Sequence, residues 1–145
     1  MKSIVCILLL MSATEGFASY SIHFIQPIED RKEISCKEIK INHGRLNGSN
    51  WNYTINSEKE YKNLIGEGSQ IDFTKYTLLG IVSSSGGCKS PTVNHNVFYS
   101  NSDNLFQFEL TVQENGGCEN VFHFEIWCLI SKMNSSSRIE FIKKP

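Results

Sequence analysis

Apolar and polar residues alternate along the C-terminal two thirds of the chain, and this is its strongest pattern. Residues 106–113 read Phe-Gln-Phe-Glu-Leu-Thr-Val-Gln, which places apolar side chains on one face of a strand and polar ones on the other. A second apolar face runs through 122–130, and shorter ones run through 93–99 and 139–141. Residues 78–82 are apolar on both faces, as in a strand that is covered on both sides. The pattern therefore predicts a β-rich fold.

Segments rich in glycine, serine and asparagine separate these runs and predict turns. They cover residues 83–87, 101–104, 115–117 and 134–137. With a turn at each of them, the strands run up and down as an antiparallel meander. The two Gly-Gly-Cys segments, which end at Cys88 and Cys118, then fall at the same end of the sheet because two strand lengths separate them.

One helix is predicted before the meander. Ser57-Glu58-Lys59-Glu60 is an S-x-x-E capping box, in which the serine hydroxyl and the last glutamate bind backbone amides at a helix start. Apolar residues follow at helical spacing and glycines end the element, so the helix covers about 58–66.

Two further strands are expected at 36–42 and 51–55. The predicted fold class is therefore α+β, with an antiparallel β-sheet meander of five to seven strands, of sandwich or barrel type, and one short helix.

The N-terminus has the pattern of an export signal. Lys2 precedes an apolar run over residues 4–11, and Gly16-Phe17-Ala18 provides a cleavage site. We expect cleavage near Ala18, with 19–145 as a single secreted α+β domain outside the cell or in the periplasm. The apolar run is too short for a membrane span, and no other stretch approaches the required length.

Removal of the signal takes Cys6 away and leaves four cysteines, at positions 36, 88, 118 and 128. An even number in an oxidising compartment predicts disulfides, and the spacings match no zinc motif. Cys88–Cys118 is the first pairing, because the meander brings both turns to one end of the sheet. Cys36–Cys128 follows by exclusion, with a buried free thiol at Cys128 as the alternative.

Composition and charge restrict the function classes. The 145 residues carry 14 basic and 15 acidic side chains, a net charge of −1, so there is no basic excess for nucleic acid. Apolar residues make up 40%, which excludes a disordered chain. The length of 145 residues fits one domain.

Catalytic motifs are absent from the sequence. Gly86-Gly87-Cys88-Lys89-Ser90 lacks the arrangement of a phosphate-binding loop, and there is no G-x-S-x-G. His95 and His123 are two strands apart on one face, but without metal-ligand spacing. Glu109 and Glu125 are expected on solvated polar faces. We therefore predict a protein that is not an enzyme and has neither cofactor nor metal.

A binding face is the non-catalytic candidate. Aromatic and histidine side chains form it, namely Trp51, Tyr53, His95, His123 and Trp127. The competing interpretation, which we favour, is that the helix covers the aromatic residues as a second layer. Three N-glycosylation sequons begin at Asn47, Asn52 and Asn134.

Two segments resemble a known family. Ile-Asn-Ser-Glu-Lys-Glu-Tyr at 55–61 and Ile-Asp-Phe-Thr-Lys-Tyr-Thr-Leu-Leu-Gly at 71–80, followed by a Gly-Gly turn and paired hairpins, are similar to the C-terminal domain of PrcB, a bacterial protease-complex accessory protein, and to exported Bacteroidetes relatives. The likeness spans about 52–142, although the cysteine after Gly-Gly departs from the family pattern.

The resemblance implies an envelope domain without catalytic residues that associates with another exported protein. The predicted function is accordingly an exported binding or accessory domain. A glycan-binding module or a small hydrolase is the alternative, and it would use the polar sheet face around His95, Glu109, His123 and Trp127.

Overall fold

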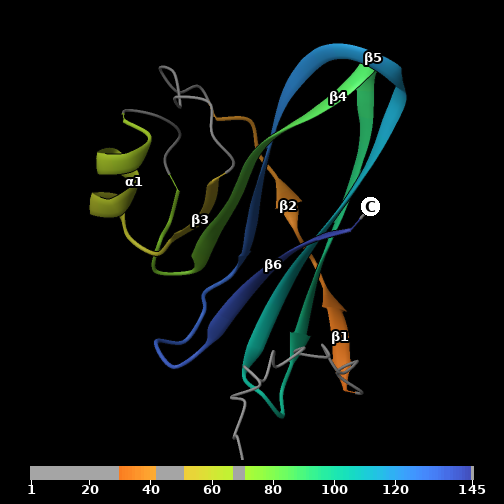
Figure 1. The fold of residues 1–145 in the computed structure, drawn as a ribbon. Helices are drawn as coiled ribbons and strands as arrows, with labels where there is room; N and C mark the ends of the chain where they lie inside the picture. The colour runs from red at the N-terminus through yellow and green to blue at the C-terminus, as the bar shows by residue number, and fades with distance from the viewer. Residues whose placement is uncertain (1–29, 42–50, 67–70, 145) are drawn as a thin grey trace, which may run out of the picture.

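The computed structural model describes residues 30–41, 51–66 and 71–144, and the expected signal peptide lies outside them. Six strands and one helix follow one another along these described residues (Figure 1). They are β1 (Arg31–Ile34), β2 (Lys37–Glu38), β3 (Trp51–Ile55), α1 (Glu58–Leu64), β4 (Tyr76–Ser100), β5 (Leu105–Ser131) and β6 (Arg138–Lys144). The predicted class, a mostly antiparallel sheet with one short helix, is confirmed.

A single long hairpin dominates the sheet. β4 and β5 pair antiparallel along nearly their whole lengths, from Tyr76 opposite Ser131 to Ser100 opposite Leu105. Both strands bend back together about halfway, at the top of Figure 1, so the hairpin has a first half near α1 and a second half near the 101–104 turn.

The expected turns at 83–87 and 115–117 are wrong. Both segments lie inside β4 and β5, opposite each other, where the register shifts between Gly86 and Thr92. Such bulges sharpen the local bend of a strand pair without ending it. The glycines therefore fold one hairpin over instead of separating four strands.

The short strands flank the two halves of the hairpin. β3 pairs with β4 and β2 with β5 along the first half, whereas β1 pairs with β4 and β6 with β5 along the second. β6 is parallel to β5, which differs from the expected meander. Of the segment expected at 36–42, the structure describes residues 36–41, and within them Lys37–Glu38 forms a strand.

The main core lies between the two halves of the folded hairpin. Leu79 and Ile81 of the first half belong to the same buried cluster as Phe106, Phe108 and Leu110 of the second. These are the inward positions that the alternation predicted, and their burial supplies the main force that holds the halves together.

A second cluster lies between the first half and α1. It contains Tyr61 and Ile65 from the helix segment, and Leu78 and Trp127 from the sheet. Leu78 and Leu79 face opposite sides, and both are fully buried, so this strand is covered on both faces as the sequence predicted. The helix starts as expected, because the amide of Glu60 donates to the hydroxyl of Ser57 at 3.2 Å.

Two short crossings connect the halves on their sides. The chain passes from β1 in the second half to β2 in the first through Cys36. Residues 132–137 cross from the end of β5 to the start of β6, with Met133 buried in the main core. On the remaining side, β3 and β6 do not pair with each other, and the sheet is not closed there.

Both expected disulfide pairs are present in the structure. Cys88–Cys118 joins β4 and β5 at the bend, with 4.7 Å between the Cα atoms. Cys36–Cys128 ties the β1–β2 crossing to β5, with a Cα distance of 5.4 Å. The first pair meets because the two cysteines face each other within one hairpin, and not because two separate turns share an end of the sheet. Two disulfides indicate an oxidising, extracytoplasmic setting.

Among the described residues, no helix has the length and apolar character needed to cross a bilayer.

Candidate functional site

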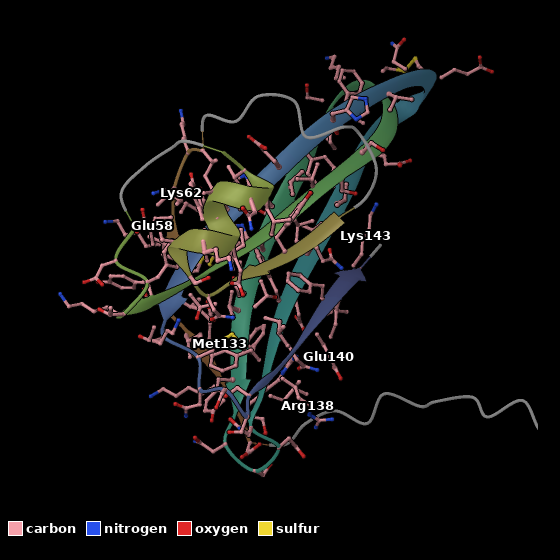
Figure 2. The ribbon with its side chains drawn as sticks, turned by 90° about the vertical axis from the view of Figure 1, so that its left-hand side faces the viewer. Glu58, Lys62, Met133, Arg138, Glu140 and Lys143 are labelled. Carbon is pink, nitrogen blue, oxygen red and sulfur yellow. A yellow bond between two sulfur atoms is a disulfide. The ribbon has the colours of Figure 1, made fainter. Side chains whose placement is uncertain are left out.

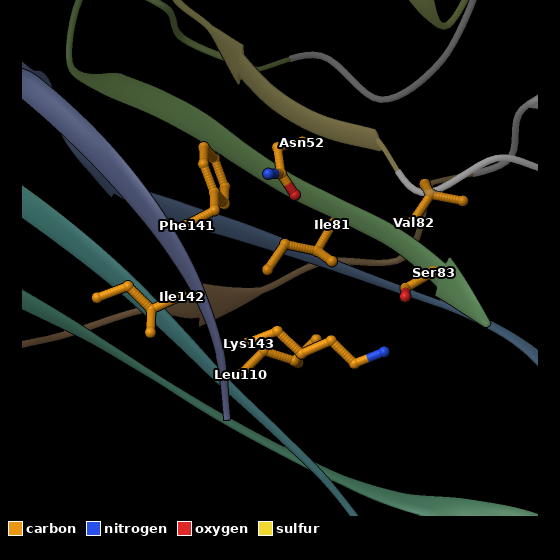
Figure 3. Close-up of a pocket in the computed structure, with 8 residues that line it drawn as sticks. All are labelled: Asn52, Ile81, Val82, Ser83, Leu110, Phe141, Ile142 and Lys143. Atoms are coloured by element: carbon orange, nitrogen blue, oxygen red, sulfur yellow. The ribbon is translucent and has the colours of Figure 1, made fainter. Parts of the chain in front are cut away.

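The candidate site is the opening between β3 and β6, which we call the seam. A cavity of 180 Å³ lies in it, and Figure 3 shows Asn52 of β3 and Phe141 of β6 pointing into the space between the two strands. Ile81 and Leu110 of the main core form its floor. The other lining residues are Val82, Ser83, Ile142 and Lys143.

Two shallower depressions continue the seam along β6. One is lined by Thr54, Met133 and Ile139 near the start of the strand, together with residues of the 132–137 crossing. The other lies beside Glu114 and the end of β6. The first two hollows therefore follow the edge of β6 that faces β3, which has no strand partner among the described residues, whereas the third lies between the end of β6 and β5.

Asn104 sets the position of β6. This residue has a φ of +50° in the β4–β5 turn, a conformation that asparagine tolerates better than most residues. Its carbonyl accepts from the amide of Arg138 at 3.0 Å, and its side chain accepts from the hydroxyl of Ser137 at 2.7 Å. The hairpin turn thus holds the first residue of β6 beside the start of β5.

Lysines dominate the charge of the seam. Lys132, Lys143 and Lys144 line its hollows, against the single carboxylate of Glu114. Lys132 donates to the backbone carbonyl of Asn56 at 2.6 Å, and no carboxylate of the described residues pairs with it. Lys143 is exposed and has no recorded partner among the described residues, and Figure 2 shows it near the end of β6.

Glu109 lies next to the seam and is buried, which corrects the expectation that it is solvated. Lys144 donates to one carboxylate oxygen at 2.6 Å, and Arg31 of β1 forms an ion pair with the other. Burial by itself raises the pKa of Glu109, but the hydrogen bonds from Lys144 and Arg31 outweigh it and lower the pKa below its usual value. The side chain of Glu109 is 10% exposed, so this ion pair links β1, β5 and β6 at a partly desolvated position.

Glu109→Gln is expected to lower the free energy of unfolding by about 1–2 kcal/mol at pH 7, because two cations lose a buried partner but remain partly exposed. A carboxyl whose folded pKa is depressed stabilises the fold above its unfolded pKa, and this contribution is lost as pH falls below about 4.5. Urea unfolding of both proteins at pH 7 and pH 3 should show the difference shrinking in acid. An equal difference at both pH values would contradict the ion-pair explanation.

His95 faces the core side of β4 instead of an open surface. Its Nε2 atom lies 3.5 Å from Sγ of Cys36 and 3.4 Å from a carboxylate oxygen of Glu38, and its ring packs edge-on against Phe108. The sulfur belongs to a disulfide, so His95 contacts an oxidised cysteine and not a free nucleophile.

The described residues of the proposed aromatic face lie in different environments. Trp127 is 2% exposed and packs on Tyr53 with 5.4 Å between ring centroids, in the cluster under α1. Burial also raises the pKa of Tyr53. His123 is exposed on β5, and Trp51 of β3 pairs with Val82 of β4. Tyr53 and Trp127 are in contact, and Trp127 lies under α1, as the covering interpretation expected for this residue.

Hydrogen bonds from neighbouring side chains and amides lower the pKa values of two aspartates. The hydroxyl of Ser100 donates to Asp30 at 2.7 Å, and the amide of Ser102 adds a second bond at 3.0 Å. The hydroxyl of Thr74 does the same for Asp72. In the described part of the chain, no three histidine, cysteine or acidic side chains cluster as metal ligands would.

The sequence does not predict the seam, because its position depends on which strands pair. The apolar residues of 139–142 were expected to form a strand, but nothing local shows that this strand would pair parallel to β5 and leave its other edge opposite β3. The one available signal was the short 132–137 connection, which carries the buried Met133 across the core.

Comparisons with protein-family models, with curated proteins and with solved structures found no match. The likeness to PrcB-type domains therefore stays a prediction from motifs.

Proposed function

We propose that this protein is an exported, non-enzymatic binding domain that holds an extended segment of another exported protein in the seam. The observation that carries the proposal is an apolar groove along two strand edges that do not pair with each other. Strand edges expose unpaired backbone amides and carbonyls, and many proteins bind extended partners by adding a strand there.

The size of the cavity supports a side chain as its occupant. Its 180 Å³ is below the roughly 300–1,000 Å³ of small-molecule sites, and the adjoining hollows of 370 and 550 Å³ are more open to solvent. Ile81, Leu110 and Phe141 offer an apolar floor, whereas Asn52 and Lys143 stand at a polar rim. This combination suits one apolar side chain of a bound polypeptide.

The arrangement of the titratable groups favours binding over the hydrolase alternative. Glu109 is neutralised by two cations, His95 contacts a disulfide sulfur, and Trp127 is covered by the helix layer. A catalytic site needs such groups to converge on one cavity. The motif likeness to the PrcB family points to the same kind of role.

Affinity capture with paired variants tests the proposal. Asn52→Trp places a bulky side chain at the mouth of the cavity, and Asn120→Trp makes the same change on the exposed bend of the hairpin. We expect the wild-type protein and Asn120→Trp to retain one stoichiometric partner from the exported fraction of the source organism, and Asn52→Trp to lose it. Equal recovery by both variants, with both folded by circular dichroism, would show that the seam is not the binding site.

A further inference from the structure

We infer that the reduced form of this protein binds one zinc ion at the β1–β2 crossing, through Cys36, Glu38, His95 and Cys128. In the oxidised protein the two sulfur atoms are bonded to each other, and the described residues contain no cluster of metal ligands. An exported chain begins with reduced cysteines, so zinc and an oxidant compete for the same pair. The inference is independent of the seam, which lies at the opposite edges of the two halves of the hairpin.

The crossing and three strands bring the four side chains together. Glu38 is the cross-strand partner of Cys128 in the β2–β5 pair, so both side chains lie on the same face of the sheet. Cys36 comes two residues before Glu38, and its bridge to Cys128 places it on that face as well. His95 reaches the same place from β4 in the second half, where its ring packs edge-on against Phe108.

The distances around His95 match those between the ligands of a tetrahedral zinc ion. Its Nε2 atom lies 3.5 Å from Sγ of Cys36 and 3.4 Å from a carboxylate oxygen of Glu38. Zinc bonds are roughly 2.3 Å long to sulfur and roughly 2.0–2.1 Å long to nitrogen and oxygen. At tetrahedral angles, such bonds separate nitrogen from sulfur by about 3.6 Å and nitrogen from oxygen by about 3.3 Å. Both distances from the imidazole nitrogen therefore fit one shared ion.

Cys128 supplies the fourth ligand once the disulfide is reduced. Two molecules of a small thiol, oxidised to their own disulfide, convert the Cys36–Cys128 bridge into two thiols. Zinc then displaces one proton from each thiol and binds both thiolates. The two Cα atoms are 5.4 Å apart, and rotation of the two side chains separates the sulfur atoms to the required distance of about 3.8 Å.

Burial and ligand type favour zinc at this position. The side chain of His95 is 13% exposed and Cys128 is fully buried, whereas the side chain of Glu38 stands at the rim and is 70% exposed. Thiolate and imidazole ligands select zinc over magnesium and calcium, which prefer oxygen. Four protein ligands close the site, as in structural zinc sites. The ion would therefore replace the disulfide as the link between the β1–β2 crossing and β5.

Cobalt(II) serves as a coloured probe, because a tetrahedral site with thiolate ligands gives it charge-transfer and visible absorption bands. The secreted chain with Cys88→Ala and Cys118→Ala keeps one cysteine pair. After reduction and removal of the thiol without air, we expect this protein to bind one cobalt ion with these bands, and zinc to displace it. The chain with Cys36→Ala and Cys128→Ala, reduced in the same way, should show no such bands.

Histidine variants test the ligand set in the reduced protein. His95→Gln should weaken zinc binding by about 100-fold or more, measured by competition with a chromophoric chelator, since loss of an outer partner of a ligand already costs up to that much. His123→Gln, the same change on the exposed face of β5, should leave the affinity unchanged. Equal affinities of the two variants would overturn the inference.

A second measurement covers the case in which reduction unfolds the chain. Zinc should then restore the circular dichroism of the sheet, because an ion that binds the folded chain stabilises it. Absence of both the cobalt bands and this recovery would overturn the inference.

Discussion

Replacing Gly80 by alanine is expected to reduce the free energy of unfolding by about 3 kcal/mol, near the upper end for overpacking. Gly80 lies directly opposite Trp127 in the β4–β5 pair and opposite Tyr53 in the β3–β4 pair. A Cβ atom on Gly80 would lie within 2.8 Å of three ring carbons of Trp127. The indole lies flat across the glycine to reach Tyr53, so this approach requires a residue without a side chain.

The ring of Trp127 has little room to move away. It is 2% exposed in the cluster under α1, and its Nε1 atom donates to Glu125 at 3.2 Å. An added methyl group must therefore displace a ring held by packing and by a hydrogen bond, or shift the backbone of two paired strands.

Urea unfolding followed by tryptophan fluorescence measures the effect, with Gly117→Ala as the matched control. A Cβ atom on Gly117 would have no neighbour within 4 Å, so that variant should unfold within about 0.5 kcal/mol of the wild type. In a Trp127→Leu background, the cost of Gly80→Ala should fall well below its value in the wild type. An undiminished cost there would mean that backbone freedom at Gly80, and not contact with the ring, explains the loss.

The apolar–polar alternation and the capping box predicted the buried strand faces and the helix start of this fold. The inward positions Phe106, Phe108 and Leu110 are buried, and the two faces of 122–130 divide as expected between the core and the layer under α1. Local signals suffice there because a side chain's face follows from its position along the strand. The capping box at Ser57 is likewise a local device, and the helix begins where it predicts.

Glycine-rich segments misled the sequence analysis because glycine serves both turns and bulges. Gly116 has a φ of +88°, and a Cβ atom there would lie 2.7 Å from Sγ of Cys88, so the residue is needed for the close approach of two strands and not for a chain reversal. The sequence alone cannot distinguish a turn from a bulge, since a glycine with a positive φ between two strands can serve either.

The electrostatic surroundings of Glu109 could not be predicted from the sequence either. Glu109 occupies a polar position of an alternating strand, which ordinarily faces water. It is buried because β1 and β6 bring Arg31 and Lys144 to the same carboxylate from strands 78 and 35 residues away in the chain. The position of a partner that is distant in sequence depends on the strand order, and the parallel pairing of β6 was the part of that order without a local signal.

The position of the seam follows from the same strand order. The β1–β2 crossing, with its Cys36–Cys128 disulfide, and the 132–137 crossing connect the two halves of the folded hairpin, and no crossing among the described residues joins the halves on the side with β3 and β6. A partner strand added there would bind to a frame that is fixed elsewhere, which reduces the conformational entropy lost on binding.

Removal of the Cys36–Cys128 disulfide, by replacing both cysteines with alanine, is expected to lower the free energy of unfolding by up to about 4.5 kcal/mol. The bridge closes a segment of 92 residues, and the chain-entropy relation gives that value for a loop of this size. Cys88–Cys118 closes 30 residues, so its removal should cost up to about 3.5 kcal/mol. Urea unfolding of the two double variants at pH 7 tests this order, and a larger loss for the shorter loop would contradict it.

The two disulfides should also differ sharply in their rate of reduction in the folded protein. Cys88 and Cys118 are both exposed at the bend, whereas Cys128 is fully buried and Cys36 is half-buried. A reducing thiolate reaches only Cys36 in the second pair, and its attack would expel the thiolate of Cys128 into the apolar core, where a charge is costly.

Timed reduction with dilute dithiothreitol, followed by alkylation and peptide mass mapping, measures both rates. Cys88 and Cys118 should be alkylated at least tenfold sooner than Cys36 and Cys128, and the difference should disappear in 6 M guanidinium, where unfolding exposes all four sulfur atoms. Equal rates in the folded protein would mean that Cys128 is reached without unfolding. In that case the packing of Leu79, Ile130 and Met133 would not protect the bridge that joins the β1–β2 crossing to β5.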